Sequence, residues 1–363
     1  MIGTRGIPAM YGGFETCVDE ISTRLVKNRN YKVIVYCRKG NYDDSLKEYK
    51  GVELIHIPSL KTKITDTFSH SFFSILHAIY LKADIFLVMN AANGLLCLLP
   101  RLMNKVIIIN VDGLEWKRKK WGPIGKAFYL FSERICAILA TRIISDAKAI
   151  KDYYIHRYHT DSTYIAYGAD IEYSDNKKSI LNEYGLKPDE YIFIASRLEP
   201  ENNADIAIRA MEMVNTNKYL VIAGGANYDS DYIKKIQDTN DKRIIFLGPV
   251  YKDGHIKELH CNCFAYFHGN EVGGTNPALL KAMGYGNMIF AINNRFNKEV
   301  LGGAGIFSTK NKHELAHNLQ KFLDHPKKRE YYQDMARKRI KEYYTWDLIT
   351  DKYKRLFDSY SNS

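Results

Sequence analysis

Short apolar runs rich in β-branched residues recur along the chain, and each is followed by a more polar segment. A continuous apolar run is typical of a strand in a parallel sheet, because helices cover both faces of such a sheet. The alternation therefore predicts α/β domains. The runs are Val33–Cys37, Ile85–Met89, Val106–Val111 and Ile143–Ser145 in the first half, and Tyr191–Ala195, Tyr219–Ala223, Ile244–Leu247, Phe264–Phe267 and Met288–Ile292 in the second.

The two sets of strands predict two domains. The first set ends near Tyr167–Ile171, and 363 residues are enough for each domain to bury its own core. We expect one domain at residues 1–168, a second at 169–344 and a terminal segment at 345–363. That segment is predicted to be helical, since its apolar residues have helical spacing. They are Trp346, Leu348, Ile349, Tyr353 and Leu356.

The segment His268–Gly286 combines a polar glycine loop with a marked helix start. Gly274, with the glycine before it, allows backbone amides to approach a ligand closely. Thr275 or Asn276 is expected to cap a helix that begins at Pro277. A helix N-terminus carries free amides and partial positive charge, so the segment predicts a phosphate or diphosphate site. The competing interpretation is an ordinary loop-to-helix junction.

Two further loops have the same character. The segment GTRGIPAMYGGFE, residues 3–15, leads into an expected helix with Val18, Ile21 and Leu25 on one face. The segment ASRLEPENN, residues 195–203, places Arg197 just after an apolar run. Ligands of open α/β sheets gather at the ends of strands, so the three loops predict a site shared by two α/β halves.

Together the three segments resemble the nucleotide-sugar glycosyltransferases of family 4, especially their bacterial rhamnosyltransferase branch, over residues 2–355. The resemblance implies the GT-B fold, with two Rossmann-like domains and an active site in the cleft between them. Residues 1–168 would bind the acceptor and residues 169–344 the nucleotide-sugar. Residues 345–363 would return to the N-terminal domain as a crossover helix.

The same resemblance implies the reaction. It implies a retaining hexosyltransferase that moves L-rhamnose from dTDP-L-rhamnose onto a lipid-diphosphate-linked saccharide in bacterial surface polysaccharide assembly. The alternatives are a transferase for another hexose and a catalytically weak nucleotide-sugar-binding protein. A nicotinamide-dependent oxidoreductase would also be α/β, but the turn at residues 3–6 lacks the spacing of a dinucleotide-binding loop.

Four residues of the second and third loops are expected to contact the donor. Arg197 is the leading diphosphate ligand, and its competing interpretation is a surface ion pair with Glu199 or Glu201. Asn202 occupies the place of a family lysine and is a weaker diphosphate contact or a turn residue. The resemblance implies that Gly12 and Gly13 lie beneath the transferred sugar and diphosphate, and the alternative is a turn that needs positive φ.

Asp112 closes the run Val106–Val111, so it lies at the carboxyl end of a parallel strand. We expect it to orient or deprotonate the acceptor hydroxyl, and the alternative is an Asp turn before Gly113. His268 also ends a strand, where it could contact the donor or be a buried, hydrogen-bonded histidine.

Lys281 is the sharpest departure from the resembled family, whose members commonly have a ribose-binding glutamate at this position. Either Lys281 partly replaces the cation absent at Asn202, or it damages the ribose site. A second departure is the chain start, because only Met1 and Ile2 precede the first glycine. So short a central strand is expected to leave neighbouring backbone groups unpaired, as in a truncated or misassigned start.

A basic segment follows Asp112 and indicates an anionic membrane surface, because interfacial aromatic residues flank its cations. The alternative is a solvated charged loop. The segment consists of Trp116, Lys117, Arg118, Lys119, Lys120 and Trp121.

Composition agrees with an anionic partner, since the formal net charge is +11 with neutral histidines. No paired-carboxylate metal motif is evident, and we expect no metal and no cofactor. No nucleic-acid motif is recognisable, so we expect no nucleic-acid partner. No signal peptide or membrane-length apolar run is evident either. The six cysteines show no CxxC spacing and are expected to be reduced thiols. We therefore expect a cytoplasmic protein, peripheral at the inner face of the cell membrane.

Overall fold

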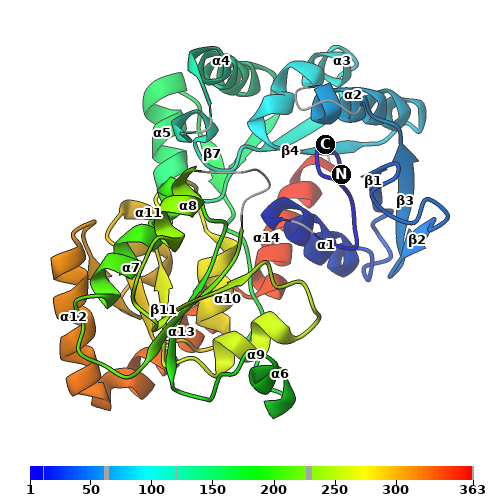
Figure 1. Ribbon diagram of the computed structural model, residues 1–363. Coiled ribbons are helices and arrows are strands. Elements are labelled where there is room, and N and C mark those ends of the chain that lie inside the picture. Colours follow the sequence, from blue (N-terminus) through cyan, green and yellow to red (C-terminus); the bar gives the residue numbers. More distant parts are fainter. Residues whose placement is uncertain (11, 61–64, 120, 226–230, 362–363) are drawn as a thin grey trace. The chain divides into compact units, whose positions relative to one another are not determined.

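The computed structural model describes residues 1–10, 12–60, 65–119, 121–225 and 231–361, which form two compact units (Figure 1). Unit 1 comprises residues 1–168 and 346–363, and unit 2 comprises residues 169–345. Each unit contains parallel strands with helices between them, so the α/β class with two Rossmann-like domains is confirmed.

The strands of unit 1 form two sheets with the orders β1-β3-β2 and β4-β5-β6-β7. All neighbouring strands run parallel except β2, which is antiparallel to β3. The strands are β1 Ile34–Arg38, β2 Glu48–Tyr49, β3 Val52–Ile57, β4 Ile85–Met89, β5 Val106–Asn110, β6 Arg142–Ser145 and β7 Ser162–Tyr164.

Met1 and Ile2 join these two sheets. The Met1 carbonyl accepts a hydrogen bond from the Tyr36 amide of β1 at 3.1 Å, and the Ile2 amide donates to the Leu87 carbonyl of β4 at 2.9 Å. The Met89 amide in turn donates to the Ile2 carbonyl at 2.9 Å. The expected unpaired backbone groups are therefore not found at these positions, because two residues suffice to pair with both neighbouring strands.

Helices cover the sheets of unit 1, and the last helix of the chain belongs to this unit. That helix, α14, packs against α1 and buries Trp346, Ile349, Tyr353 and Phe357. The predicted terminal helix in the N-terminal unit is thus confirmed. The helices are α1 Gly13–Leu25, α2 Thr65–Tyr80, the 3-10 helix η1 Ala91–Cys97, α3 Leu98–Leu102, η2 Glu115–Lys117, α4 Pro123–Leu139, α5 Lys148–Tyr158 and α14 Trp346–Ser361.

Unit 2 contains one six-stranded parallel sheet with the order β10-β9-β8-β11-β12-β13. Strands β8 and β11 are neighbours near its middle, so the loops that follow them lie at the same edge. The strands are β8 Tyr191–Ala195, β9 Tyr219–Ala223, β10 Ile244–Gly248, β11 Ala265–His268, β12 Ile289–Ile292 and β13 Ile306–Ser308.

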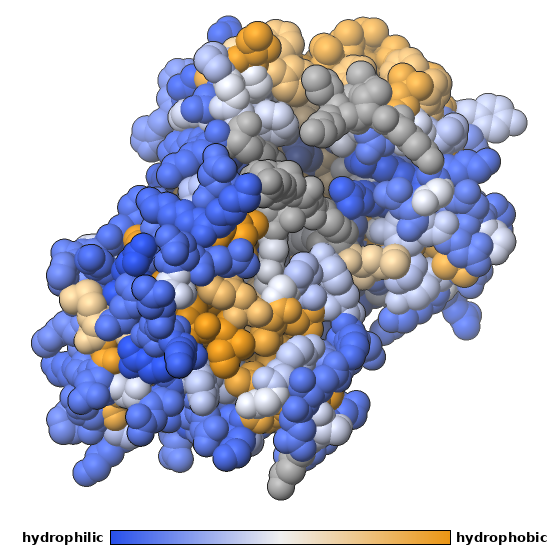
Figure 2. All heavy atoms as spheres, viewed as in Figure 1, coloured by the Kyte–Doolittle hydropathy of each residue, from blue (hydrophilic) through white to orange (hydrophobic). Residues whose placement is uncertain are grey.

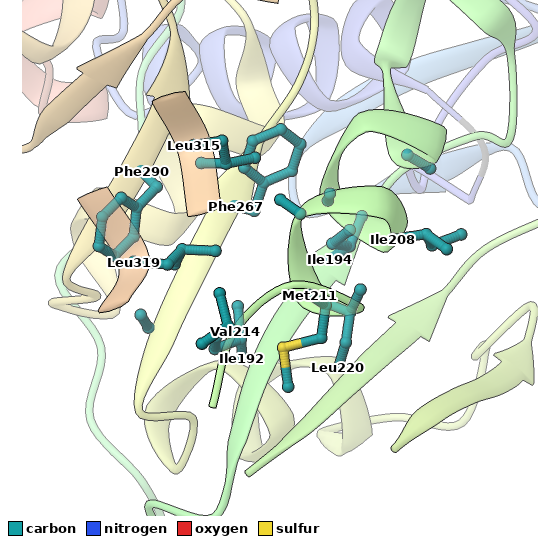
Figure 3. Close-up of a cluster of buried hydrophobic side chains, with 14 of the residues drawn as sticks. Ile192, Ile194, Ile208, Met211, Val214, Leu220, Phe267, Phe290, Leu315 and Leu319 are labelled. Atoms are coloured by element: carbon teal, nitrogen blue, oxygen red, sulfur yellow. The ribbon is translucent and has the colours of Figure 1, made fainter. Parts of the chain in front are cut away.

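Apolar side chains of the strands pack against helices to form the core of unit 2. Ile192 and Ile194 of β8 lie near Ile208 and Met211 of α7, and Phe290 of β12 belongs to the same cluster (Figure 3). The helices are α6 Lys178–Glu183, η3 Pro200–Asn202, α7 Ala204–Met211, α8 Asp231–Gln237, α9 His255–Cys261, α10 Pro277–Gly284, α11 Arg295–Leu301, α12 Lys312–Asp324, η4 Pro326–Lys328 and α13 Arg329–Tyr343.

Every strand predicted from an apolar run is present, with ends within one residue of the prediction. The sequence pattern missed β2, β3, β7 and β13. Strand β3 has the sequence VELIHI, in which Glu53 and His56 interrupt the apolar residues, and β7 and β13 have only three residues each. Neither pattern gives a continuous apolar run.

Candidate functional site

Arg197 lies two residues beyond the carboxyl end of β8, and its side chain is exposed. Backbone hydrogen bonds fix the loop, since the Ser196 amide donates to the Ala223 carbonyl and the Leu198 amide to the Gly225 carbonyl, both at 3.1 Å. Within the described part of the chain, Arg197 forms no ion pair with Glu199 or Glu201. The guanidinium is therefore free to bind an anion at this edge of the sheet.

Asn202 closes the same loop. Its buried side-chain amide donates to the Arg197 carbonyl at 2.7 Å. Its own carbonyl oxygen approaches Gly269 so closely that a Cβ there would lie only 2.0 Å away. The geometry favours the turn interpretation of Asn202, and its contact with a diphosphate stays a prediction.

Asn203 connects this loop to the loop after β11, a role that the sequence pattern did not reveal. Its backbone has a φ of 52°, a conformation that asparagine tolerates better than most residues. Its side-chain amide donates to the Gly269 carbonyl at 2.7 Å and to the Glu271 carboxylate at 2.6 Å. Lys310 pairs with the other oxygen of Glu271 at 3.0 Å. The two loops at the sheet edge are thus held together.

His268 ends β11 and is buried. Within the described residues neither ring nitrogen has a hydrogen-bond partner, so the histidine is buried, as one interpretation expected, but not hydrogen-bonded. Burial lowers the pKa of His268 to about 3, because it disfavours the charged imidazolium. The neutral ring keeps an unused donor and an unused acceptor at the carboxyl end of the strand.

The GGTNP segment forms the predicted junction between loop and helix. The side chain of Asn276 caps α10 by accepting a hydrogen bond from the Ala278 amide at 2.9 Å, and Pro277 is the first helical residue. The predicted helix start is confirmed. Gly274 and Thr275, which precede this cap, are both buried. Their contact with a phosphate stays a prediction.

Lys281 lies one turn into α10 with an exposed side chain. No hydrogen bond or ion pair of its ammonium group is found among the described residues. The positive charge of Lys281 nevertheless acts on Glu172. Partial burial raises the pKa of Glu172, and the ammonium groups of Lys257 and Lys281 oppose that rise. Lys281 is therefore an available cation on the helix that follows the glycine loop.

In unit 1 the first glycine loop crosses the end of β4 and leads into α1. Gly3 has a φ of 97°, and a Cβ there would lie 2.4 Å from the Met89 carbonyl oxygen. Gly12 caps α1 in an extended conformation with a φ of −149°, so the interpretation of Gly12 as a positive-φ turn is wrong. Gly13 is the first helical residue. Tyr11 of the same motif lies outside the described residues.

Glu15 stabilises this loop. Its buried carboxylate accepts a hydrogen bond from the Arg5 amide at 3.0 Å, which ties the start of the loop to the first turn of α1. One turn further, Asp19 accepts from the Ala9 amide at 2.8 Å. Glu15, in the first turn, also complements the positive end of the helix dipole. The role of both carboxylates is thus to shape the loop.

Asp112 lies two residues beyond β5, half-buried and with a φ of 55°. Its amide donates to the Asn110 side chain at 3.1 Å, and its carboxylate accepts from the Tyr167 hydroxyl at 3.1 Å. Burial raises the pKa of the Asp112 carboxyl, and the nearby Glu115 carboxylate raises it further. A carboxylate whose pKa is raised binds a proton more readily than an ordinary aspartate does, as a general base must.

A second layer of side chains orients Asn110. Its amide donates to the hydroxyl of Tyr353 at 2.9 Å, and both side chains are buried. Tyr353 belongs to α14, so the last helix of unit 1 supports the strand end that carries Asp112. Sequence reasoning found neither Tyr167 nor Tyr353, because they lie 55 and 243 residues from their partners.

The basic segment after Asp112 is packed against unit 1 more closely than expected. Trp116 and Trp121 are half-buried, with rings 6.4 Å from Tyr153 and 5.2 Å from Tyr129. Arg118 forms an ion pair with Glu115 at 2.5 Å. Lys117 and Lys119 are exposed, and Lys120 lies outside the described residues. The segment thus presents lysines but no projecting tryptophan.

Two further observations concern metals and membranes. Among the described side chains, no three histidine, cysteine, aspartate or glutamate residues lie together in a way that could hold a metal ion. No described helix is long and apolar enough to cross a membrane.

Two family models match the chain in adjacent segments. Residues 1–170 match a domain of unknown function, DUF1972, and residues 176–339 match glycosyl transferases group 1. An uncharacterized glycosyltransferase of Methanocaldococcus jannaschii is 22% identical over 97% of this chain and 96% of its own length.

Solved structures share the fold. Anabaena Alr3699/HepE in complex with UDP-glucose has a TM-score of 0.79 at 15% identity, covering 98% of each chain. Sucrose-phosphate synthase from Thermosynechococcus elongatus has a TM-score of 0.78 at 15% identity, covering all of this chain and 96% of its own. These likenesses confirm the predicted GT-B architecture.

Proposed function

Because residues 176–339 match the family model of glycosyl transferases group 1, we propose that the chain transfers a sugar from a nucleotide-sugar donor. The favoured donor is dTDP-L-rhamnose and the favoured acceptor a lipid-linked saccharide, with retention of anomeric configuration. The motifs at residues 11–15 and 273–277 support the rhamnosyl assignment through their resemblance to that branch of family 4. The protein would act in bacterial surface polysaccharide assembly, at the inner face of the cell membrane.

The observation that carries this proposal is the exposed guanidinium of Arg197, which pairs with no carboxylate among the described residues. It lies at the carboxyl edge of the sheet, where the β8 and β11 loops are tied together through Asn203. As the bond to the sugar breaks, negative charge grows on the leaving diphosphate, and a fixed cation stabilises that charge. A guanidinium can bind two phosphate oxygens at once.

On the acceptor side, we assign Asp112 to the acceptor hydroxyl. Tyr167 holds its carboxylate, and the raised pKa suits a group that accepts a proton. Lys117 and Lys119 lie on the same stretch of chain and would attract an acceptor that carries a diphosphate.

A screen of donors tests the proposal. Purified protein is mixed with dTDP-L-rhamnose, dTDP-glucose, UDP-glucose or NAD, and thermal unfolding and donor hydrolysis are measured. We expect the cognate nucleotide-sugar to raise the unfolding temperature, because a ligand that binds only the native state stabilises it. If only UDP-glucose stabilises the protein, the proposed donor sugar is another hexose and not rhamnose. Stabilisation without hydrolysis or transfer would favour a catalytically weak binding protein, and stabilisation by NAD alone would contradict the proposal.

Replacing Lys281 tests whether this lysine contributes to donor binding. If its exposed ammonium contacts the diphosphate, Lys281→Ala should lower kcat/KM for the donor by about 10-fold, the effect of losing one charge-assisted contact. Lys281→Glu should be worse, because it adds a negative charge. The control is Lys321→Ala, which removes an exposed lysine from α12 of the same unit.

Steady-state kinetics at varied donor concentration distinguish the two interpretations of Lys281. If Lys281→Ala leaves kcat/KM unchanged and Lys281→Glu raises it, the lysine impairs a ribose site and does not serve the diphosphate.

A further inference from the structure

Helix α2 is amphipathic in the opposite sense to a normal surface helix. Its buried positions hold Ser69, His70, Ser71 and Ser74 alongside Ile75 and Ala78, and all of these are less than a tenth exposed. Its exposed positions hold large apolar residues, and Tyr80 is 79% exposed. A helix in contact with water on one side normally exposes its polar face. The exposed apolar residues are Phe68, Phe73, Leu76 and Tyr80.

Helix α4 has the same inverted pattern. It buries Ser132, Glu133 and Cys136 together with Tyr129, and the Glu133 carboxylate accepts hydrogen bonds from Tyr153 and Tyr158. Ile124, 87% exposed, begins an apolar stripe at helical spacing on the outer face. The stripe continues through Phe128, Phe131 and Ile138.

The segment between α2 and α4 extends this apolar surface. The helix η1 packs against α2, α3 and α4, so all four elements are neighbours. Leu102 of α3 is 70% exposed, and Leu98, Leu99 and Met103 are exposed beside it. Figure 2 shows apolar residues gathered over the part of unit 1 where α4 and α3 lie. We call the exposed apolar residues of α2, α3 and α4 the apolar face.

The charges near the apolar face are mainly positive. Lys82, Arg101, Lys126 and Arg134 are exposed on these helices or directly after them. The acidic residues are mostly engaged elsewhere: Asp66 pairs with Arg38 at 2.6 Å, and Glu133 is buried. The exception is Asp84, which is exposed near Lys82. Cations around an apolar centre match a surface that is anionic outside and apolar beneath.

We propose that the apolar face seats unit 1 on an anionic lipid bilayer, with the apolar side chains inserted among the lipids and the surrounding cations against the headgroups. This inference deepens the proposed function, on which it rests for a lipid-linked acceptor. Each inverted helix leaves apolar surface in water that an interfacial position would bury. The helices would lie in the membrane surface, since none of those described could span it.

Co-sedimentation with vesicles tests the proposal. The full chain is mixed with vesicles of phosphatidylglycerol and phosphatidylethanolamine, or of phosphatidylcholine alone. The double variant Phe128→Glu, Phe131→Glu adds charge to the exposed stripe of α4. The matched control, Met213→Glu with Tyr251→Glu, changes two exposed apolar residues of unit 2. Thermal unfolding of all three proteins checks that each is folded.

We expect the wild type and the control to bind the anionic vesicles, and the α4 variant to bind them at least about tenfold more weakly. Neutral vesicles should bind the wild type several-fold more weakly, because the cations lose their partners. Raising the salt should weaken wild-type binding without abolishing it, since salt screens charge but not apolar contact.

Three results would overturn the proposal. The wild type does not bind the vesicles, the α4 variant binds them as well as the wild type does, or the wild type forms a dimer in solution that the α4 substitutions abolish. The last would identify a second copy of the chain as the occupant of the face. Donor hydrolysis without vesicles is measured in parallel. If the wild type does not hydrolyse any donor but the α4 variant still loses vesicle binding, the proposed function fails and the membrane surface stands.

Discussion

Replacing Arg197 by alanine is expected to lower kcat/KM for the nucleotide-sugar by about 10- to 100-fold, while the protein stays folded. A hydrogen bond to a charged group contributes roughly 1.5–3 kcal/mol, and the effect grows if the contact strengthens as the diphosphate leaves. The side chain is exposed and makes no ion pair with its neighbours in the described loop, so its loss breaks no ion pair there.

Kinetics and thermal unfolding of three variants check this prediction. Arg197→Lys should retain part of the activity, because an ammonium keeps the charge but loses the two-pronged geometry. The control is Arg209→Ala, which removes another exposed arginine of unit 2, paired with Glu212 at 3.3 Å. Full activity of Arg197→Ala would remove the diphosphate assignment, and a lowered unfolding temperature would point to a structural role.

For Asp112→Asn we expect kcat to fall by about 100- to 10,000-fold with little change in donor affinity, the effect typical of losing a general base. The amide keeps the shape of the side chain and can still accept from Tyr167, but it cannot take a proton. Equal losses in donor affinity and turnover would instead indicate a donor-binding or structural role. Asp161→Asn, at an exposed site of unit 1, is the matched control.

The pH profile gives a second measurement on Asp112. Burial, and then the Glu115 carboxylate, raise its pKa above that of an ordinary aspartate. The base works only when ionised, so activity should be lost as the pH falls through this raised value. Tyr167→Phe removes a hydrogen bond that favours the carboxylate, and should move the acidic limb to higher pH. Asp112→Asn should abolish the limb. An unchanged limb in that variant would assign it to another group.

Much of the fold could be predicted from apolar runs alone, since a strand covered on both faces must be apolar along its whole length. The run Tyr191–Ala195 is an example, because its sequence bounds are those of β8. The method fails where polar residues interrupt a strand or where a strand is very short. In Val52–Ile57 the polar residues Glu53 and His56 interrupt the run, and Met1 and Ile2 act as a strand only through their neighbours.

The local geometry of the candidate site was predictable where neighbouring residues determine it. Pro277 preceded by asparagine specifies a helix start, and the structure has the cap at Asn276. Groups that orient a site from afar leave no local signal, as Tyr167 and Tyr353 show. Helical spacing also fails to tell which face of a helix is buried. In α2 and α4 the apolar stripe faces outward, so the aromatic residues nearest water are not the two tryptophans of the basic segment.

The position of α14 bears on how the chain folds during synthesis. Residues 169–345 are continuous, so unit 2 can assemble as soon as they leave the ribosome. Unit 1 lacks Trp346, Ile349 and Tyr353 until the stretch 346–361 has been made. The first half of the protein to be translated is therefore the last to complete its core, and until then the Asn110 side chain below Asp112 lacks the hydroxyl that receives its hydrogen bond.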